Sequence, residues 1–275
     1  MSFPEELSFT HPHVQRLRRL VGRRSSRTEE ASFVVEGYKT LSEALDSGAQ
    51  ILAVFAANDF EHPVISRCEA AGIIVHRLAE GVIERVADTI SPQPVMAVVE
   101  APERTLADLR DPIRKGGFVL VCVEIRDPGN AGTVIRSAEA AGAVGVIFTD
   151  DSVEVTNPKT VRASAGALFH IPVVAGLSIV ELADSFESWG VRVWATEARS
   201  GTSTPMSEAD LTGPTAFVMG NEAHGLSKEQ RSLFANGLSI EMVGRSESLN
   251  LSMAATLVCF EAARQRRGVG VPGLG

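Results

Sequence analysis

The chain of 275 residues has few cysteines, few aromatic residues, no long apolar run and no excess of positive charge. Its three cysteines, Cys68, Cys122 and Cys259, lack the spacing of metal ligands, so we expect reduced, mostly buried thiols and no metal site. No apolar run is long enough to cross a bilayer and the first residues lack a signal core, which predicts a cytoplasmic protein. One tyrosine and two tryptophans offer little for stacking single-stranded bases.

The charge is acidic overall and basic in one place. A net charge of −8 and a pI near 5.4 argue against a protein that coats nucleic acid indiscriminately. Residues 13–27 nevertheless contain no acid and six arginines: Arg16, Arg18, Arg19, Arg23, Arg24 and Arg27. Two interpretations remain open for this segment, a solvated helix face or a local patch that contacts phosphates.

Apolar runs alternate with short amphipathic segments over residues 1–100. We expect strands at 32–36, 51–56, 73–75 and 95–99 and helices at 12–21, 38–46, 63–71 and 79–87. The alternation predicts a compact α/β domain. Residues 101–116 are charged and punctuated by prolines and glycines, so we expect a linker there.

The same rhythm resumes over residues 117–275, with more strongly apolar strands. We expect strands at 118–125, 144–148, 191–195 and 215–219, an apolar run at 238–242, and helices at 133–141, 159–169, 178–189 and after 252. Apolar strands separated by helices predict a mainly parallel sheet covered on both faces. Because ligands bind at the carboxyl ends of such strands, the loops that follow them are the candidate site.

The first candidate loop is residues 127–132 (DPGNAG). It matches neither a dinucleotide-binding fingerprint nor a P-loop, which disfavours a nucleotide-dependent α/β enzyme. Its two glycines suggest a tight turn with positive φ. Arg136 follows on a helix, where the apolar Val134 and Ile135 predict that its side chain is partly buried. A buried arginine requires a carboxylate or phosphate partner.

Two further loops carry polar side chains. Glu222 follows a predicted strand, where a carboxylate could hold an arginine, accept a proton or simply face solvent. Residues 248–252 (SLNLS) open the last helix, and a serine or asparagine there predicts an N-cap. Three polar residues are more than a cap requires, and a helix start suits a polar ligand or phosphate.

Together, residues 127–136 (DPGNAGTVIR), 218–226 (VMGNEAHGL) and 240–242 followed by 248–252 resemble the motifs of the SpoU/TrmH family. These are RNA ribose 2′-O-methyltransferases of the SPOUT superfamily, and the resemblance covers residues 117–267. Residues 1–100 are more loosely similar to the L30e-like substrate-binding domain of its rRNA-modifying branch, which includes the thiostrepton-resistance methyltransferases. The resemblance implies a trefoil-knotted C-terminal domain, a homodimer and S-adenosylmethionine as cofactor.

The resemblance also implies roles for particular residues. Matching catalytic-region residues are Asn130, Arg136, Glu222, Ser248 and Asn250, and matching cofactor contacts are Thr196, Gly220, Ile240 and Leu249. Glu241 stands where the family usually has proline. The implied reaction is ribose 2′-O-methylation of 23S rRNA, with tRNA methylation or a non-catalytic RNA-binding protein as alternatives.

A mechanism follows from these assignments as a hypothesis. A guanidinium is a poor base because its pKa exceeds about 12. We therefore expect Arg136 to clamp a phosphate beside the target ribose, with Asn130 and Glu222 orienting it, and Ser248 and Asn250 to hold the hydroxyl or the cofactor. Phosphates of a structured RNA are expected to contact Arg18, Arg19, Arg23, Arg24 and Lys39.

Overall fold

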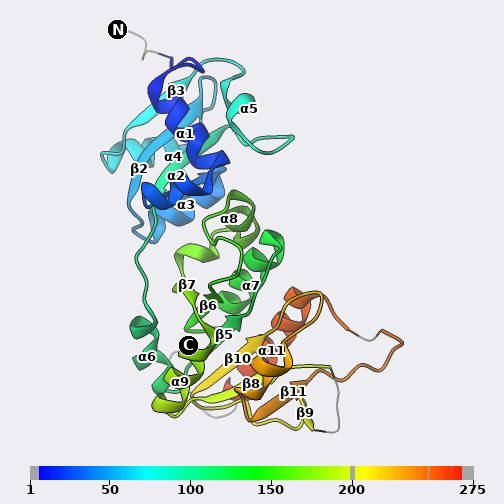
Figure 1. Cartoon of the computed structure of the whole chain (residues 1–275). Coiled ribbons are helices and arrows are strands. Elements are labelled where there is room, and N and C mark those ends of the chain that lie inside the picture. The colour runs from blue at the N-terminus through cyan, green and yellow to red at the C-terminus, as the bar shows by residue number, and fades with distance from the viewer. Residues whose placement is uncertain (1–5, 199–201, 247, 268–275) are drawn as a thin grey trace. The chain divides into compact units, whose positions relative to one another are not determined.

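The structure, a computed structural model, describes residues 6–198, 202–246 and 248–267 (Figure 1). The chain divides into two compact units, Met1–Glu103 with Thr156–Phe169, and Arg104–Val155 with His170–Gly275. Residues 156–169 were expected in the second domain and group with the first unit. Helix α6 (Leu106–Arg114) lies in the expected linker and groups with the second unit.

The first unit contains a four-stranded sheet in the order β1-β4-β2-β3. Its strands are β1 (Ser32–Glu36), β2 (Ile51–Ala57), β3 (Val75–Leu78) and β4 (Val95–Glu100). Strand β4 pairs antiparallel with β1 and with β2, whereas β2 and β3 are parallel. The first five residues of β4 are buried, as expected for a strand with neighbours on both sides.

Helices cover both faces of this sheet. They are α1 (Pro12–Gly22), α2 (Arg24–Glu29), α3 (Tyr38–Asp46), α4 (Pro63–Ala70), α5 (Val82–Val86), α8 (Pro158–Ser164) and the 3-10 turn η1 (Ala167–Phe169). Successive residues of a strand point to opposite faces. Val34 accordingly packs in one core with Leu17 of α1, and Phe33 packs in the other with Leu41 of α3 and Val161 of α8.

The second unit is built on a seven-stranded sheet in the order β7-β6-β5-β10-β8-β11-β9 (Figure 1). Its strands are β5 (Phe118–Cys122), β6 (Gly145–Thr149), β7 (Val173–Leu177), β8 (Arg192–Thr196), β9 (Ser203–Pro205), β10 (Thr215–Met219) and β11 (Asn236–Ser239). The described pairings are all parallel. The predicted α/β class with a mainly parallel sheet is confirmed, while the knot remains a prediction.

The helices of the second unit after α6 are α7 (Pro128–Ala140), α9 (Ile179–Trp189), α10 (Lys228–Ser232) and α11 (Leu251–Arg267). Helices α7 and α11 lie against each other, and Ser137 Oγ and Thr256 Oγ1 share a hydrogen bond of 2.7 Å between them. Helices α6 and α9 contribute Leu109 and Phe186 to a core shared with Val119 of β5.

Arg266 anchors the last turn of α11. Its buried guanidinium donates to the carbonyl oxygens of Gly116, Leu211 and Gly213 at 3.0, 2.6 and 2.8 Å, and lies 4.8 Å from the ring centroid of Phe118. Burial lowers the pKa of Arg266 to about 10, so the group remains charged at neutral pH. The helix is thereby tied to the loops that precede β5 and β10.

Cys68, Cys122 and Cys259 are free and buried, as predicted. Over the ranges that the structure describes, no helix has both the length and the apolar character needed to span a bilayer.

Candidate active site

Four parallel strands end at the same edge of the second sheet, and their last residues are level. Met219 of β10 pairs with Cys122 of β5, and Val218 pairs with Ala195 of β8. Leu238 of β11 pairs with Thr196. The predicted cofactor contacts Thr196, Gly220 and Ile240 therefore come together at the carboxyl edge, where ligands of parallel sheets bind.

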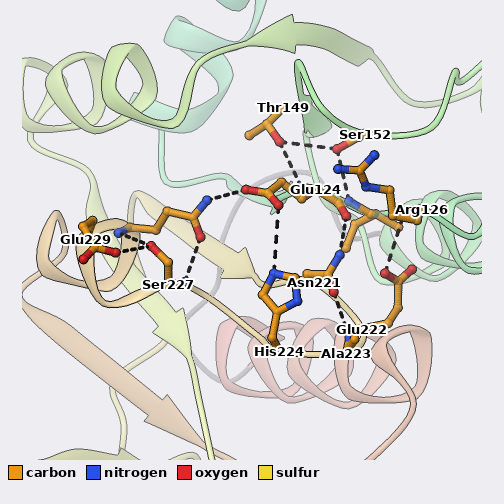
Figure 2. A network of polar contacts seen from close by, with 12 residues as sticks. Glu124, Arg126, Thr149, Ser152, Asn221, Glu222, Ala223, His224, Ser227 and Glu229 are labelled. Carbon is orange, nitrogen blue, oxygen red and sulfur yellow. Dashed lines mark hydrogen bonds and ion pairs between the residues drawn. The ribbon is translucent and has the colours of Figure 1, made fainter.

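The loop after β10 is closed by its own backbone. Asn221 N donates to Gly225 O at 3.1 Å, and Gly225 N donates to Asn221 O at 2.9 Å. The Asn221 side chain accepts the Ala223 amide at 2.8 Å. A Cβ at Gly220 would lie 2.4 Å from the carbonyl carbon of Gly225, so only glycine fits there. The closed turn projects Glu222 and His224 from the sheet edge (Figure 2).

The segment expected to be a glycine loop is the first turn and a half of helix α7. Asp127 is the N-cap and accepts the Asn130 amide at 2.8 Å, and Pro128 occupies the first helical position, which suits its fixed φ. Neither Gly129 nor Gly132 is among the positive-φ residues. The prediction of a turn with positive φ at these glycines is wrong because the cap starts the helix earlier.

Three predicted catalytic residues form one hydrogen-bonded trio. Asn130 Nδ2 donates to Glu222 Oε1 at 3.2 Å, and Asn250 Nδ2 donates to Asn130 Oδ1 at 3.2 Å. The Glu222 carboxylate also accepts the backbone amides of Arg126 and Asp127 at 3.4 and 3.3 Å. The three motif segments are thus joined through their side chains. We call Asn130, Glu222 and Asn250 the polar trio.

The hydrogen bonds also define how the two amides of the trio are turned. Asn250 Oδ1 accepts Ser252 N at 2.9 Å and Ser252 Oγ at 2.6 Å, which makes Asn250 the N-cap of α11. Its NH2 group therefore faces Asn130, whose own NH2 group faces the Glu222 carboxylate. Each NH2 carries two protons, of which one has an acceptor among the residues that the structure describes, so the other can donate to a substrate oxygen.

Glu124 lies at the centre of a second network beside the trio (Figure 2). Its backbone N donates to Thr149 Oγ1 at 3.0 Å and its carbonyl accepts Asn221 Nδ2 at 2.8 Å. Its side chain accepts Gln230 Nε2 at 2.6 Å. Glu124 has φ 54, a left-handed conformation that costs a non-glycine residue about 1–3 kcal/mol. A glutamate after an apolar strand carries no sequence signal of this role, so the role of Glu124 could not be predicted.

Arg136 does not take the partly buried position that the sequence predicted. Its side chain is exposed and forms no ion pair within the described ranges. The buried face of α7 is formed by Ala131, Gly132, Val134, Ile135 and Ala138. At 3.6 residues per turn, position 136 points away from that face. Apolar neighbours in sequence were therefore a poor guide to its burial.

The remaining predicted residues of the third motif lie outside the trio. Ser248 is exposed, and Leu249 keeps 38% of its surface accessible. Glu241, at the position where proline was expected, is held instead by a contact of its carboxylate with Ser207 Oγ. Glu241, Ser248 and Leu249 lie in the segment before α11, and no hydrogen bond joins them to Glu222 among the described residues.

Four of the six N-terminal arginines are exposed: Arg18, Arg19, Arg23 and Arg24. The other two have structural partners, since Arg16 pairs with Glu30 at 2.6 Å and buried Arg27 donates to the carbonyls that end α1. Lys39 is also exposed. Arg85, which the sequence analysis missed, lies 3.7 Å from the Phe9 ring centroid, and Arg18 lies 5.4 Å from it.

In the described parts of the chain, no three His, Cys, Asp or Glu side chains lie close enough together to hold a metal ion.

Residues 117–260 match the SpoU rRNA Methylase family, and residues 11–97 match the MRM3-like substrate binding domain. The chain belongs to the SpoU rRNA methylase family. The resemblance inferred from the three motifs is confirmed, and with it the predicted class of enzyme. In this SpoU chain the match begins one residue before β5 and ends within α11, so it includes the polar trio.

Curated relatives match nearly the full length of the SpoU chain. It is 32% identical over 237 residues to the 23S rRNA (guanosine(2553)-2'-O)-methyltransferase RlmP of Bacillus subtilis, covering 86% of this chain and 90% of that one. It is also 32% identical over 268 residues to the 23S rRNA (uridine(2479)-2'-O)-methyltransferase of Streptomyces viridochromogenes, covering 92% and 89%.

Solved structures share the whole architecture. The SpoU methyltransferase AviRb from Streptomyces viridochromogenes, in complex with AdoMet, has a TM-score of 0.83 and 30% identity over 94% of this chain and 100% of that one. An AdoMet-bound rRNA methyltransferase from Sinorhizobium meliloti has a TM-score of 0.80 and 31% identity over 94% and 97%.

Proposed function

We propose that this SpoU protein transfers a methyl group from S-adenosylmethionine to a ribose 2′-hydroxyl of 23S rRNA. The polar trio carries the proposal, because it joins side chains of all three family motifs at the carboxyl edge of the sheet. The names of the relatives support the substrate, since two of them act on 23S rRNA. AdoMet-bound relatives with the same fold support the cofactor.

The carboxyl edge suits a cofactor held mainly by backbone groups. Thr196 is the last residue of β8, and Gly220 and Ile240 directly follow the neighbouring strands β10 and β11. The tight approach of Gly220 to Gly225 leaves no room for a side chain. Exposed apolar side chains follow β11, with Met242 36% and Leu249 38% accessible, as a surface for an adenine ring requires. We assign the cofactor to this edge, with Thr196, Gly220, Ile240 and Leu249 as its contacts.

When bound, S-adenosylmethionine supplies an electrophilic methyl group. The protein's part is to hold the acceptor in line, and positioning of this kind can contribute about 7–11 kcal/mol. The free NH2 protons of Asn130 and Asn250 are available to donate to the ribose or its phosphate. Glu222 is already held by two backbone amides and Asn130, so it acts as the fixed point that orients Asn130.

Arg136 and Ser248 complete the proposed acceptor site. Arg136 is exposed and has no carboxylate partner among the described residues, which leaves its guanidinium available for a phosphate. A guanidinium is a poor base, so we assign Arg136 the role of a clamp. Ser248, one turn before α11, would hold the hydroxyl or the cofactor.

We assign RNA capture to the first unit, which would be the substrate-binding domain of residues 1–100. The exposed Arg18, Arg19, Arg23 and Arg24, together with Lys39 and Arg85, offer positive charge on an acidic protein. Localised charge of this kind suits a structured RNA recognised at a few phosphates. Ribosomal RNA as substrate would place the protein in the cytoplasm.

We propose a knotted homodimer as the working form. Helix α11 exposes an apolar stripe of Met253, Leu257 and Phe260, which are 60%, 44% and 45% accessible. Their spacing places them on one face of the helix, and an exposed apolar patch supports a protein interface. Light scattering should give twice the chain mass for the wild type. The chain mass alone for the wild type would refute the dimer, and Leu257→Arg should reduce the dimer to monomer.

The decisive test is methyl transfer by the purified protein from radiolabelled S-adenosylmethionine to 23S rRNA fragments and, in parallel, to tRNA. Label that maps to one ribose, and is lost when that ribose is replaced by 2′-deoxyribose, supports the proposal. Label in tRNA alone would favour the alternative substrate. Tight RNA binding with no cofactor binding and no label would favour a non-catalytic RNA-binding protein.

A further inference from the structure

Helix α10 follows the Glu222 loop directly and is held in place mainly by polar contacts. It has only five residues and buries none of their side chains. A helix this short is not stable by itself, so its contacts with neighbouring loops must fix it. Two adjacent side chains make those contacts, Gln230 and Arg231, and they reach different parts of the site.

Gln230 contacts the acceptor side of the site, by which we mean the segments that carry Asn130 and Glu222. Its Nε2 donates to Glu124 Oε1 at 2.6 Å, while its Oε1 accepts Ser227 N at 2.9 Å within the same turn. The Glu124 carbonyl accepts the Asn221 side chain at 2.8 Å. Glu124 is also in the strained left-handed region, where surrounding contacts must hold it. Gln230 therefore restrains both the segment leading to Asn130 and the loop carrying Glu222.

Arg231 contacts the cofactor side of the site, by which we mean the ends of β8, β10 and β11. Its Nε lies 2.8 Å from Glu197 Oε2 and its Nη2 lies 3.3 Å from Glu197 Oε1, a two-pronged pair in which both side chains are half-buried. Glu197 directly follows Thr196, and its backbone N donates to Leu238 O at 3.0 Å. The pair thus lies where β8 and β11 end.

Gly237 of β11 shows how closely this ion pair approaches the strand. A Cβ at that position would lie 2.0 Å from Glu197 Oε1 and 2.6 Å from Arg231 Nη2. The pair packs directly on the backbone of β11, three residues before Ile240. A movement of α10 would be transmitted to the strand ends that carry the assigned cofactor contacts.

We propose that α10 couples the two halves of the active site, with Gln230 and Arg231 as positioning residues. Arg231 holds the strand ends that meet the cofactor, and Gln230 holds the segments that carry Asn130 and Glu222. Occupation of the cofactor side then stiffens the acceptor side through five residues of helix. The inference rests on the proposed function, because it assigns the cofactor to the edge of β8, β10 and β11.

A double-mutant cycle tests the coupling in the full-length protein. Gln230→Ala should leave the Kd for S-adenosylmethionine within about twofold of wild type and slow single-turnover methyl transfer about 3- to 30-fold. Arg231→Met should weaken cofactor binding and also slow transfer at saturating cofactor. The transfer rate of the double variant should fall by a smaller factor than the product of the factors for the two single variants. Ser232→Ala is the matched control, because Ser232 is exposed on α10 and its Oγ donates to the carbonyl of Glu229 within the same helix.

Hydrogen exchange provides a readout that does not need turnover. Saturating S-adenosylmethionine should slow amide exchange over residues 124–130 in the wild type, although none of them is an assigned cofactor contact. Gln230→Ala should bind the cofactor and lose that protection, whereas Ser232→Ala should retain it. If no RNA is methylated but this pattern holds, the proposed function fails and the coupling survives.

A third variant separates positioning from a general loss of structure. Gln230→Glu places a carboxylate against that of Glu124, whose Oε2 lies 4.0 Å from His224 Nε2 in the wild type as well. Two adjacent carboxylates can share a proton at low pH but repel when both are charged. The transfer rate of this variant relative to wild type should rise as the pH is lowered. Three results would each overturn the inference. The first is a double variant whose loss of transfer rate equals the product of the two single losses. The second is unchanged exchange protection of residues 124–130 in Gln230→Ala, and the third is a ratio of Gln230→Glu to wild-type rate that does not depend on pH.

Discussion

Asn130 Nδ2 donates to Glu222 Oε1 across 3.2 Å, although the two residues are 92 positions apart in the chain. The bond joins the first turn of α7 to the loop after β10. Because Glu222 is also held by the amides of Arg126 and Asp127, Asn130 can turn in only one way without losing a partner. Its orientation is therefore settled before substrate arrives, as preorganised catalysis requires.

Asn130→Ala should slow methyl transfer about 100-fold, because the acceptor loses a fixed donor and Glu222 and Asn250 lose their link. The Kd for S-adenosylmethionine should change less than about twofold, since we assign Asn130 to the acceptor and not to the cofactor. Single-turnover rates and calorimetry check the two halves of this prediction. Asn58→Ala is a matched control, because it removes an amide–carboxylate bond, to Glu6, in the first unit. A normal rate for Asn130→Ala would remove the trio from the mechanism.

Arg136→Ala and Arg136→Lys should be almost equally damaging, at about 100-fold, if the guanidinium grips a phosphate with two parallel bonds. Neither change should lower the melting temperature, because the side chain is exposed. Arg110→Ala, at an exposed arginine of α6, controls for loss of one positive charge. Near-normal turnover in the lysine variant would show that charge alone suffices.

Replacing Arg18, Arg19 and Arg23 together by alanine should weaken RNA binding and leave cofactor affinity unchanged. The slope of log Kd against log salt should fall by about one for each lost phosphate contact. The matched control replaces Arg110, Arg114 and Lys115, which are also exposed and belong to the second unit. Equal losses in both triple variants would mean that RNA responds only to net charge.

Burial lowers the pKa of His76, and the neighbouring His13 and His11 lower it further. The folded protein therefore binds this proton less readily than the unfolded chain, so stability should fall as the pH drops below about 6.5. His76→Phe keeps a ring that can stack on Phe55 and His13, and its melting temperature should depend less on pH between about 5 and 7. Exposed His170→Gln is the control, and a wild-type slope in His76→Phe would contradict the assignment.

The central elements of both sheets could be predicted because burial on both faces makes their sequences continuously apolar. Strand β10 has the predicted bounds for this reason, and β4, which has neighbours on both sides in the first sheet, ends one residue later than predicted. Strand β9 could not be predicted, since three partly buried residues at a sheet edge carry no apolar pattern. The helix at residues 128–132 did have a signal, the Asp127–Pro128 pair, which glycine content obscured.

Part of the candidate site could be predicted from the sequence, although its geometry could not. The resemblance to the SpoU/TrmH motifs predicted Asn130, Glu222 and Asn250 as catalytic-region residues, and the structure brings these three side chains together. The sequence could not indicate that Arg136 faces solvent, because that depends on which side of α7 meets the sheet. Nor could it reveal the roles of Glu124 and Gln230. These roles depend on the left-handed backbone of Glu124 and on a hydrogen bond between two residues that are 106 positions apart.

Helix α8 belongs to the first unit although β6 and β7, which flank it in sequence, belong to the second. Its Val161 is buried in the same core as Phe33, and a Cβ at the nearby Gly166 would lie 2.6 Å from Glu43 of α3. Deleting residues 1–103 would therefore expose the buried face of α8 and would not yield an intact methyltransferase domain. Chimeras that exchange substrate-binding domains between relatives must carry residues 156–169 along with the N-terminal part, as a two-segment graft.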